Sequence, residues 1–280
     1  MRVILLFFLF VQVCYGQNSN LDFNTRPYDA IDRWVVLNKT ESNPNYTLGF
    51  VYIDPQVGFK LNYHGQIELL NNEIKLLPRL DSVDRKMSLD QQTADLALLS
   101  DKHINQLNLP IKPSWLADYK LNEDFTSYKL GIGSALNAIG ASHKALPILQ
   151  QAYKEDMHYP GLEFELAYAY NATGSHYKAV IILNTAIEND PSNFWYYREL
   201  GFAFKHLDNL PEAEKTYLKG IELANDNFQK AEMAINMVQS YFHIQNRIKF
   251  DEWKQIVLSY AEPNSDFFGY IKYFEDNWGK

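Results

Sequence analysis

The chain has 280 residues, of which 46% are apolar and 15% aromatic, so it can bury a core large enough for one large or two modest domains. Its formal net charge is −8 at pH 7. Because such a surface repels phosphate backbones, we do not expect nucleic acid as a partner.

The first sixteen residues have the pattern of a secretory signal peptide. A single arginine precedes an apolar run over residues 3–13, which is too short to span a bilayer as a helix. Cys14 and Gly16 then supply small residues at positions −3 and −1 of a cut before Gln17. The sequence therefore predicts a secreted or periplasmic protein. The alternative is a lipoprotein signal, in which an acylated Cys14 would hold the protein at a membrane, although Val13 is bulkier than that peptidase usually accepts.

Cleavage before Gln17 would leave a mature chain without cysteine, because Cys14 is the only one. Such a chain has no disulfide, no thiol nucleophile and no cysteine-ligated metal, so its core must be stable without cross-links. The rest of the sequence contains no second apolar run of membrane-spanning length. We therefore expect no transmembrane anchor.

Residues 17–110 predict a small β-rich domain that ends in a helix. Four segments rich in β-branched and aromatic residues cover residues 33–38, 46–54, 57–64 and 66–70. Turn signals separate them, with Asp54-Pro55 opening one turn and His64-Gly65 another, and this indicates an antiparallel meander. From Ser88 to about Asn108 the pattern becomes helical. Residues 111–125 then form a connector, and we identify no family in the domain.

Residues 126–227 repeat one pattern of small and large side chains every 34 residues. The columns are Gly133, Ala167 and Gly201; Gly140 and Gly174; Ala145, Ala179 and Ala213; and Leu149, Leu183 and Tyr217. This predicts a repeated helix pair, in which small residues permit close packing, glycine ends the first helix in a left-handed conformation, and large residues fill the space between. One pair cannot bury its apolar face alone, so neighbouring pairs stack into a solenoid.

This pattern resembles the tetratricopeptide repeat (TPR) family. The matching residues of the middle repeat are Leu166, Ala167, Tyr170, Gly174, Ala179, Leu183, Ala186 and Pro191. The resemblance implies repeats over residues 126–159, 160–193 and 194–227, a degenerate one over 228–262, and a capping helix over 263–280. The predicted fold is mainly α: a TPR-type α-solenoid preceded by a small β-rich (α+β) domain.

The resemblance also implies that the first helices of the repeats line a concave groove that holds a peptide or a partner protein. In the 34-residue register the candidate groove residues are Asn137, Phe164, Tyr168, Asn171, Trp195, Arg198, Phe202 and Lys205. Aromatic residues, arginine and asparagine can supply anchors, charge and hydrogen bonds to a peptide backbone. The alternative is that the aromatic residues pack against neighbouring helices. The family's clamp for C-terminal carboxylates is absent, because its positions hold Leu130, Ser134, Phe164 and Tyr168.

No motif indicates an enzyme. The sequence lacks HExxH, GxSxG, a phosphate loop and a dinucleotide fingerprint, so we expect no catalytic residue, no metal and no cofactor. Asp54, His64, Glu68 and Glu73 could act as acids or bases, but their spacing matches no motif. The sequence therefore predicts a non-enzymatic interaction protein. The alternative is an activity in the N-terminal domain, with the repeats as a positioning scaffold.

Overall fold

A computed structural model describes residues 21–280 apart from residues 42, 71–72, 80–82, 84, 91–92 and 94–95. The predicted signal peptide and Cys14 lie outside these residues. The chain divides into two units: Tyr52–Leu61, Lys86–Thr93 and Pro113–Lys280 form one, and the remaining described residues up to Lys112 form the other. In the described part of the chain, no helix is both long enough and apolar enough to cross a membrane.

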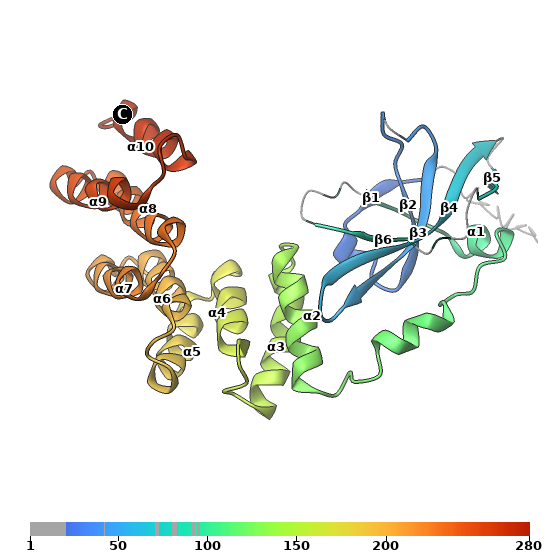
Figure 1. The fold of residues 1–280 in the computed structure, drawn as a ribbon, viewed down its shortest axis with the longest axis horizontal. Coiled ribbons are helices and arrows are strands. Elements are labelled where there is room, and N and C mark those ends of the chain that lie inside the picture. The colour runs from blue at the N-terminus through green and yellow to red at the C-terminus, as the bar shows by residue number, and fades with distance from the viewer. Residues whose placement is uncertain are drawn as a thin grey trace, which may run out of the picture. The chain divides into compact units, whose positions relative to one another are not determined.

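The N-terminal part of the chain forms an antiparallel sheet (Figure 1). Among the described residues the strand order is β1-β7-β2-β3-β4-β5, and β6 pairs with β4. The strands are β1 (Phe23–Thr25), β2 (Arg33–Leu37), β3 (Tyr46–Asp54), β4 (Gly58–Leu70), β5 (Glu73–Leu76), β6 (Arg85–Ser88) and β7 (Leu96–Leu98). Short 3-10 helices cover Pro27–Asp29 and Ser114–Tyr119.

The predicted turn at Asp54-Pro55 is confirmed, since Asp54 Oδ1 accepts a hydrogen bond from Gln56 N at 2.9 Å between β3 and β4. The predicted turn at His64-Gly65 is wrong, because both residues continue the 13-residue strand β4. A side chain at Gly65 would place its Cβ 3.0 Å from Leu76 Cδ1. The glycine therefore gives room to a side chain of the paired strand β5 instead of making a turn.

The predicted helix from Ser88 to Asn108 is wrong over its first half. Leu96–Leu98 is strand β7, which pairs with β1 and β2, and among the described residues of this range only α1 (Asp101–Gln106) is helical. Leu96 and Leu99 are both 1% exposed. A short, fully buried apolar run has no alternation, so its sequence does not distinguish a strand from a helix.

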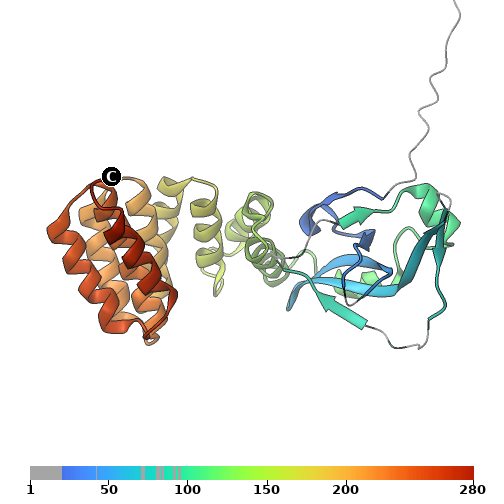
Figure 2. The same cartoon turned by 90° about the horizontal axis from the view of Figure 1, so that it is seen from above.

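From Thr126 onward the chain is helical. The helices are α2 (Thr126–Ala138), α3 (Ser142–Glu155), α4 (Leu162–Ala172), α5 (His176–Asn189), α6 (Phe194–His206), α7 (Leu210–Leu223), α8 (Asn227–His243), α9 (Arg247–Tyr260) and α10 (Asp266–Asp276). They alternate in direction as stacked pairs α2–α3, α4–α5, α6–α7 and α8–α9 (Figure 2). This part of the chain is a TPR-like helical array.

The repeated columns act as the sequence predicts. A Cβ on Gly133 would collide with the Leu149 side chain, and one on Gly201 would lie 2.6 Å from Tyr217 Cδ1, so these glycines permit close helix contact. Gly140 and Gly174 end their helices with φ of 78° and 74°. Asp208, 34 residues further on, keeps the left-handed conformation with φ of 56°.

The last helix, α10, covers the apolar end of the array. Its residues Phe267, Ile271 and Phe274 are buried in one cluster with Phe250 and Trp253 of α9. Burying one such side chain contributes roughly 1.5–3 kcal/mol, so the helix stabilises the final pair α8–α9.

Candidate partner-binding groove

The first helices of the four pairs lie side by side and form one face of the array. Direct contacts join α2 to α4, α4 to α6, and α6 to α8, whereas the second helices contact one another much less. The first helices are therefore on the inner side of the stack, as in other curved solenoids. We refer to the surface that α2, α4, α6 and α8 share as the first-helix face. All eight predicted groove residues belong to these helices.

Two of the predicted residues connect neighbouring first helices. Asn137 Nδ2 of α2 donates to Glu165 O at 2.9 Å and to Glu165 Oε2 at 2.7 Å on α4. Asn171 Nδ2 of α4 donates to Glu199 O and to Glu199 Oε2, both at 3.0 Å, on α6. The same bidentate amide–glutamate contact therefore recurs one repeat later.

The side-chain N–H groups of Asn137 and Asn171 are therefore already hydrogen-bonded within the protein. Asn137 is 3% exposed and Asn171 is 5% exposed. Ser134 also turns inward, because its Oγ donates to Glu165 Oε1 at 2.7 Å. A hydrogen bond to a charged group is worth about 1.5–3 kcal/mol, so a ligand would not displace these bonds without a large loss.

Lys205 lies 34 residues after Asn171, just as Asn171 lies 34 residues after Asn137. Its Nζ donates to Asn236 Oδ1 at 2.9 Å and to Gln239 Oε1 at 2.6 Å, both on α8. Within the described residues, no carboxylate lies within ion-pair distance of this ammonium. Burial lowers the pKa of Lys205 to about 8, and the more distant charge of Glu232 only partly opposes this.

Arg198 makes charge-assisted contacts with two carboxylates of the face. Its Nε and Nη2 donate to the two carboxylate oxygens of Glu232 at 2.6 and 3.0 Å, and its Nη1 donates to Glu199 Oε1 at 2.8 Å. Burial lowers the pKa of Arg198, but the bonds to Glu232 together with the charges of Glu232 and Glu199 outweigh it, and the net shift is upward. One guanidinium thus serves two carboxylates, and bidentate pairing fixes its plane.

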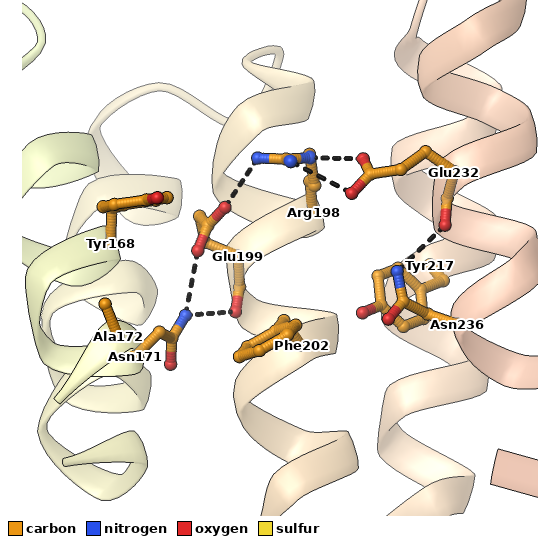
Figure 3. Close-up of a pocket in the computed structure, with 9 residues that line it drawn as sticks. All are labelled: Tyr168, Asn171, Ala172, Arg198, Glu199, Phe202, Tyr217, Glu232 and Asn236. Carbon is orange, nitrogen blue, oxygen red and sulfur yellow. Dashed lines mark hydrogen bonds and ion pairs between the residues drawn. The ribbon is translucent and has the colours of Figure 1, made fainter. Parts of the chain in front are cut away.

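A pocket of about 160 Å³ opens beside this network, between α4, α6 and α8 (Figure 3). We refer to it as the central pocket. Its lining residues are Tyr168, Asn171, Ala172, Arg198, Glu199, Phe202, Tyr217, Glu232 and Asn236. In Figure 3 the Arg198 side chain bridges from Glu199 to Glu232, while the Tyr168 ring projects from α4 and the Phe202 ring lies on α6 below this network.

Tyr217 of α7 lines the central pocket from behind. The residue is fully buried, and its hydroxyl has no hydrogen-bond partner among the described residues. Burial raises the pKa of Tyr217, and the charges of Glu199 and Glu232 raise it further. An unpaired buried hydroxyl costs about 1–3 kcal/mol, so a ligand group that pairs with it would recover this cost.

The remaining predicted aromatic residues form a cluster at the start of α4 and α6. The ring of Phe164 lies 6.4 Å from that of Tyr168 and 5.5 Å from that of Trp195. The Arg198 guanidinium lies 5.4 Å from the Trp195 ring. Trp195 is 36% exposed, and Phe164, Tyr168 and Phe202 are half-buried. These rings therefore both pack against neighbours and present edges to solvent.

The repeat register predicts the first-helix face, but it does not identify four polar residues on that face and one behind it. The four are Glu165, Glu199, Glu232 and Asn236, and the fifth is Tyr217 of α7. Two signals were available. Glu165 and Glu199 lie 34 residues apart, as do Arg198 and Glu232. Tyr217 follows Leu149 and Leu183 in a column that is otherwise purely apolar.

The N-terminal acid and base candidates do not form a comparable site. Asp54 is engaged in the β3–β4 turn, and the His64 ring packs edge-on to Trp34 at 5.2 Å. Burial lowers the pKa of His64, with a smaller contribution from Arg79. In the parts of the chain that the structure describes, no group of three or more histidine, cysteine or acidic side chains is placed to hold a metal ion.

No protein-family model matches the chain, and no curated protein matches it either. Among solved structures, the thermophilic TPR protein TTC0263 of Thermus thermophilus is 15% identical, with a TM-score of 0.48 over 57% of this chain and 87% of that one. A structure of MamA (MSR-1) is 20% identical, with a TM-score of 0.40 over 50% of this chain and 82% of that one. Likeness at this level says nothing about what this chain binds.

Proposed function

We propose that the chain is a non-enzymatic interaction protein that binds a peptide or a partner protein on its first-helix face. The observation that carries this proposal is the central pocket, which is lined both by half-buried rings and by a buried hydroxyl that has no partner among the described residues. Elsewhere on the face, the amide donors of Asn137 and Asn171 are already bonded to glutamates of the neighbouring helix. The binding energy therefore comes from the region around α6.

Aromatic and arginine side chains suit this role. Such residues dominate the energetics of interfaces when they fill or line a desolvated pocket. Tyr168 and Phe202 flank the pocket, and Trp195 and Phe164 extend the aromatic surface toward the start of α4 and α6. The buried asparagines serve as supports, because they fix the spacing of the helices that present these rings.

We further propose that the protein acts in the periplasm or the secreted space. The apolar run of residues 3–13 and the small residues before Gln17 support this location. The mass of the mature protein, purified from its own cells, tests it. A chain that begins at Gln17 supports secretion, a chain that begins at an acylated Cys14 supports membrane anchoring, and an intact Met1 contradicts both.

The binding proposal is tested by selecting 12-residue peptides from a display library on the purified protein. Selected peptides are then titrated against the variant Phe164→Ala/Tyr168→Ala/Phe202→Ala. Loss of an aromatic anchor typically costs at least ~2 kcal/mol, so binding should weaken roughly thirtyfold or more. Circular dichroism must show that the variant is folded.

Tyr177→Ala is the matched control, because Tyr177 is an aromatic residue on the second helix α5 and is 68% exposed. Peptides should bind this variant as they bind the natural protein. Equal binding to the folded triple variant, or loss with Tyr177→Ala alone, would show that peptides use another surface.

A further inference from the structure

The charges that line the central pocket do not balance. Glu199 and Glu232 face a single guanidinium, Arg198, so the three lining side chains together carry one excess negative charge when both carboxylates are ionised. Outside the lining, the Lys205 ammonium acts on Glu232 at longer range and the Glu165 carboxylate acts on Glu199, so these two charges offset each other. Each carboxylate offers about four lone-pair sites. Each accepts two side-chain hydrogen bonds: Glu232 two from Arg198, and Glu199 one from Arg198 and one from Asn171. Acceptor capacity therefore remains on both.

Burial makes this excess costly. It raises the pKa of Glu199, although Arg198 and Asn171 act in the opposite direction. A carboxylate with a raised pKa is one whose surroundings supply too little positive charge or too few donors. An additional cation in the pocket would supply both.

The Tyr217 hydroxyl is a second and independent indication. It is fully buried, lines the same pocket and has no partner in the described part of the chain. A hydroxyl oxygen accepts readily from an N–H donor, and its proton can turn toward a carboxylate. A ligand group with several N–H donors would satisfy the hydroxyl together with Glu199 and Glu232.

The walls of the pocket suit the same kind of ligand. Tyr168 and Phe202 line it with aromatic rings. A cation within about 6 Å of a ring face is stabilised, by roughly 0.5–1 kcal/mol at exposed sites and more when desolvated. The alkyl stem of a lysine or arginine also packs well along such rings.

We propose that the central pocket binds a lysine or arginine side chain of the partner, with its charged nitrogen held by Tyr217, Glu199 and Glu232. This inference rests on the proposed function, since it names the anchor that the first-helix face selects. An acidic anchor would meet two carboxylates. A purely apolar anchor would leave the hydroxyl and the remaining lone pairs of both carboxylates without donors.

The test uses the display-selected peptides and the full mature chain. Each lysine or arginine of a selected peptide is replaced in turn by norleucine, which keeps the alkyl stem and removes the charge. One replacement should weaken binding about tenfold to a hundredfold, as expected for a lost hydrogen bond to a charged group. Tyr217→Phe and Glu232→Gln should each weaken binding of the natural peptide by a similar factor.

The decisive observation is coupling. On Tyr217→Phe, the same norleucine replacement should cost far less than on the natural protein, because the interaction is already gone. Glu165→Gln is the matched control, since Glu165 lies on the same face but outside the central pocket. Tyr217→Phe removes only an unpaired hydroxyl, so it keeps the fold and the test stays interpretable.

The outcomes separate the two proposals. Two outcomes overturn this inference and leave the proposed function intact. In one, peptides bind the first-helix face but need no basic residue. In the other, the affinity losses from the norleucine replacement and from Tyr217→Phe are additive. Peptides that bind equally well to the triple aromatic variant overturn both. A preference for lysine over arginine, or the reverse, supports the inference and identifies which cation the pocket accommodates.

Discussion

Two neighbouring junctions of the first-helix face differ in how they use their polar groups. At the α4–α6 junction, the Asn171 amide and the Glu199 carboxylate meet in a buried, bidentate contact. At the α6–α8 junction, the Lys205 ammonium finds only neutral acceptors, and the Tyr217 hydroxyl finds none among the described residues. The α6–α8 junction therefore keeps a hydroxyl that the described residues do not satisfy, and this is where we place the proposed binding site.

The residues at equivalent positions of successive repeats explain why the α6–α8 junction differs from the α4–α6 junction. Residues 137, 171 and 205 are Asn, Asn and Lys, and the partner positions 165, 199 and 233 are Glu, Glu and Met. Met233 is completely buried, so it offers no carboxylate at the third step. Lys205 therefore turns to Asn236 and Gln239, and a pocket remains beside it.

The largest expected effect is the loss of the buried contact at the α4–α6 junction. Asn171→Ala leaves the Glu199 carboxylate without one of its two side-chain donors, in a site that is 5% exposed. The substitution removes one hydrogen bond to a charged carboxylate and one to a backbone carbonyl, which together cost about 2–4 kcal/mol. Urea unfolding followed by circular dichroism at 222 nm should show a loss of this size in the free energy of unfolding.

Lys205→Met provides the contrast at the α6–α8 junction. It removes two hydrogen bonds to neutral acceptors, but it also removes a largely buried ammonium that has no carboxylate within ion-pair distance in the described residues. The lost bonds and the relief of charge burial oppose each other, so the change should stay within about 1 kcal/mol. Equal losses for the two variants would mean that the junctions do not differ, and the comparison would fail.

The next effect in size concerns the close contact that places Tyr217 behind α6. Gly201→Ala would bring a methyl group 2.6 Å from Tyr217 Cδ1 and 2.8 Å from its Cγ. Overpacking of this kind costs about 1–3 kcal/mol, since the ring is completely buried and cannot move aside. The same urea experiment measures the loss.

Gly269→Ala is the control for that variant. Gly269 lies within helix α10, and nothing lies within 4 Å of an added Cβ. Alanine should therefore raise the free energy of unfolding by about 0.5–1 kcal/mol through its higher helix propensity. If both variants changed stability in the same direction, steric contact at Gly201 would not be the cause.

Much of the helical array could be predicted because its determinants are local and repeat. A helix pair shows its small residues, its left-handed glycines and its large fillers within 34 residues, and the columns Gly133–Gly201 and Gly140–Gly174 reveal them. The sheet depends on pairing between distant strands. Nothing near Leu96 shows that it pairs with β1, and Gly65 has the appearance of a turn until Leu76 is placed beside it.

The site was only partly predictable for a related reason. Position in the repeat assigns Asn137 and Asn171 to the first-helix face, but it does not show that their amides bond to Glu165 and Glu199 on the next helix. The hydroxyl of Tyr217 was missed because its ring fills the column as leucine does. The hydrogen bonds that a side chain makes to the next repeat become visible only in the three-dimensional structure.

The pH dependence of stability offers a finer distinction between buried carboxylates. The folded-state pKa of Glu199 lies above its ordinary 4.5 because of burial, so the native state holds this proton more tightly than the unfolded state. The free energy of unfolding should therefore fall as pH rises from 4.5 through the raised pKa of Glu199. Glu199→Gln removes the titration, and urea unfolding between pH 4.5 and 8 should show a shallower decline.

Glu214 should behave in the opposite way. Burial raises its pKa, but hydrogen bonds from Trp253, Lys249 and Tyr241 outweigh this and the net shift is downward. Its contribution is present above pH 4.5 and is lost as pH falls through the lowered pKa. In Glu214→Gln the acid-induced loss of stability should be smaller, whereas a slope that matched Glu199→Gln would contradict the assignment of the two environments.

The smallest change in stability is expected at the residue with the greatest proposed role in binding. Tyr217→Phe removes a hydroxyl that is buried without a partner among the described residues, so the free energy of unfolding should stay constant or rise by up to about 1 kcal/mol. If a bound partner supplies the missing hydrogen bond, the same variant should lose affinity. Urea unfolding and peptide titration of one sample measure both quantities. A loss of stability in Tyr217→Phe would mean that the hydroxyl is already satisfied in the free protein, and the difference between the two junctions would then lie in Lys205 alone.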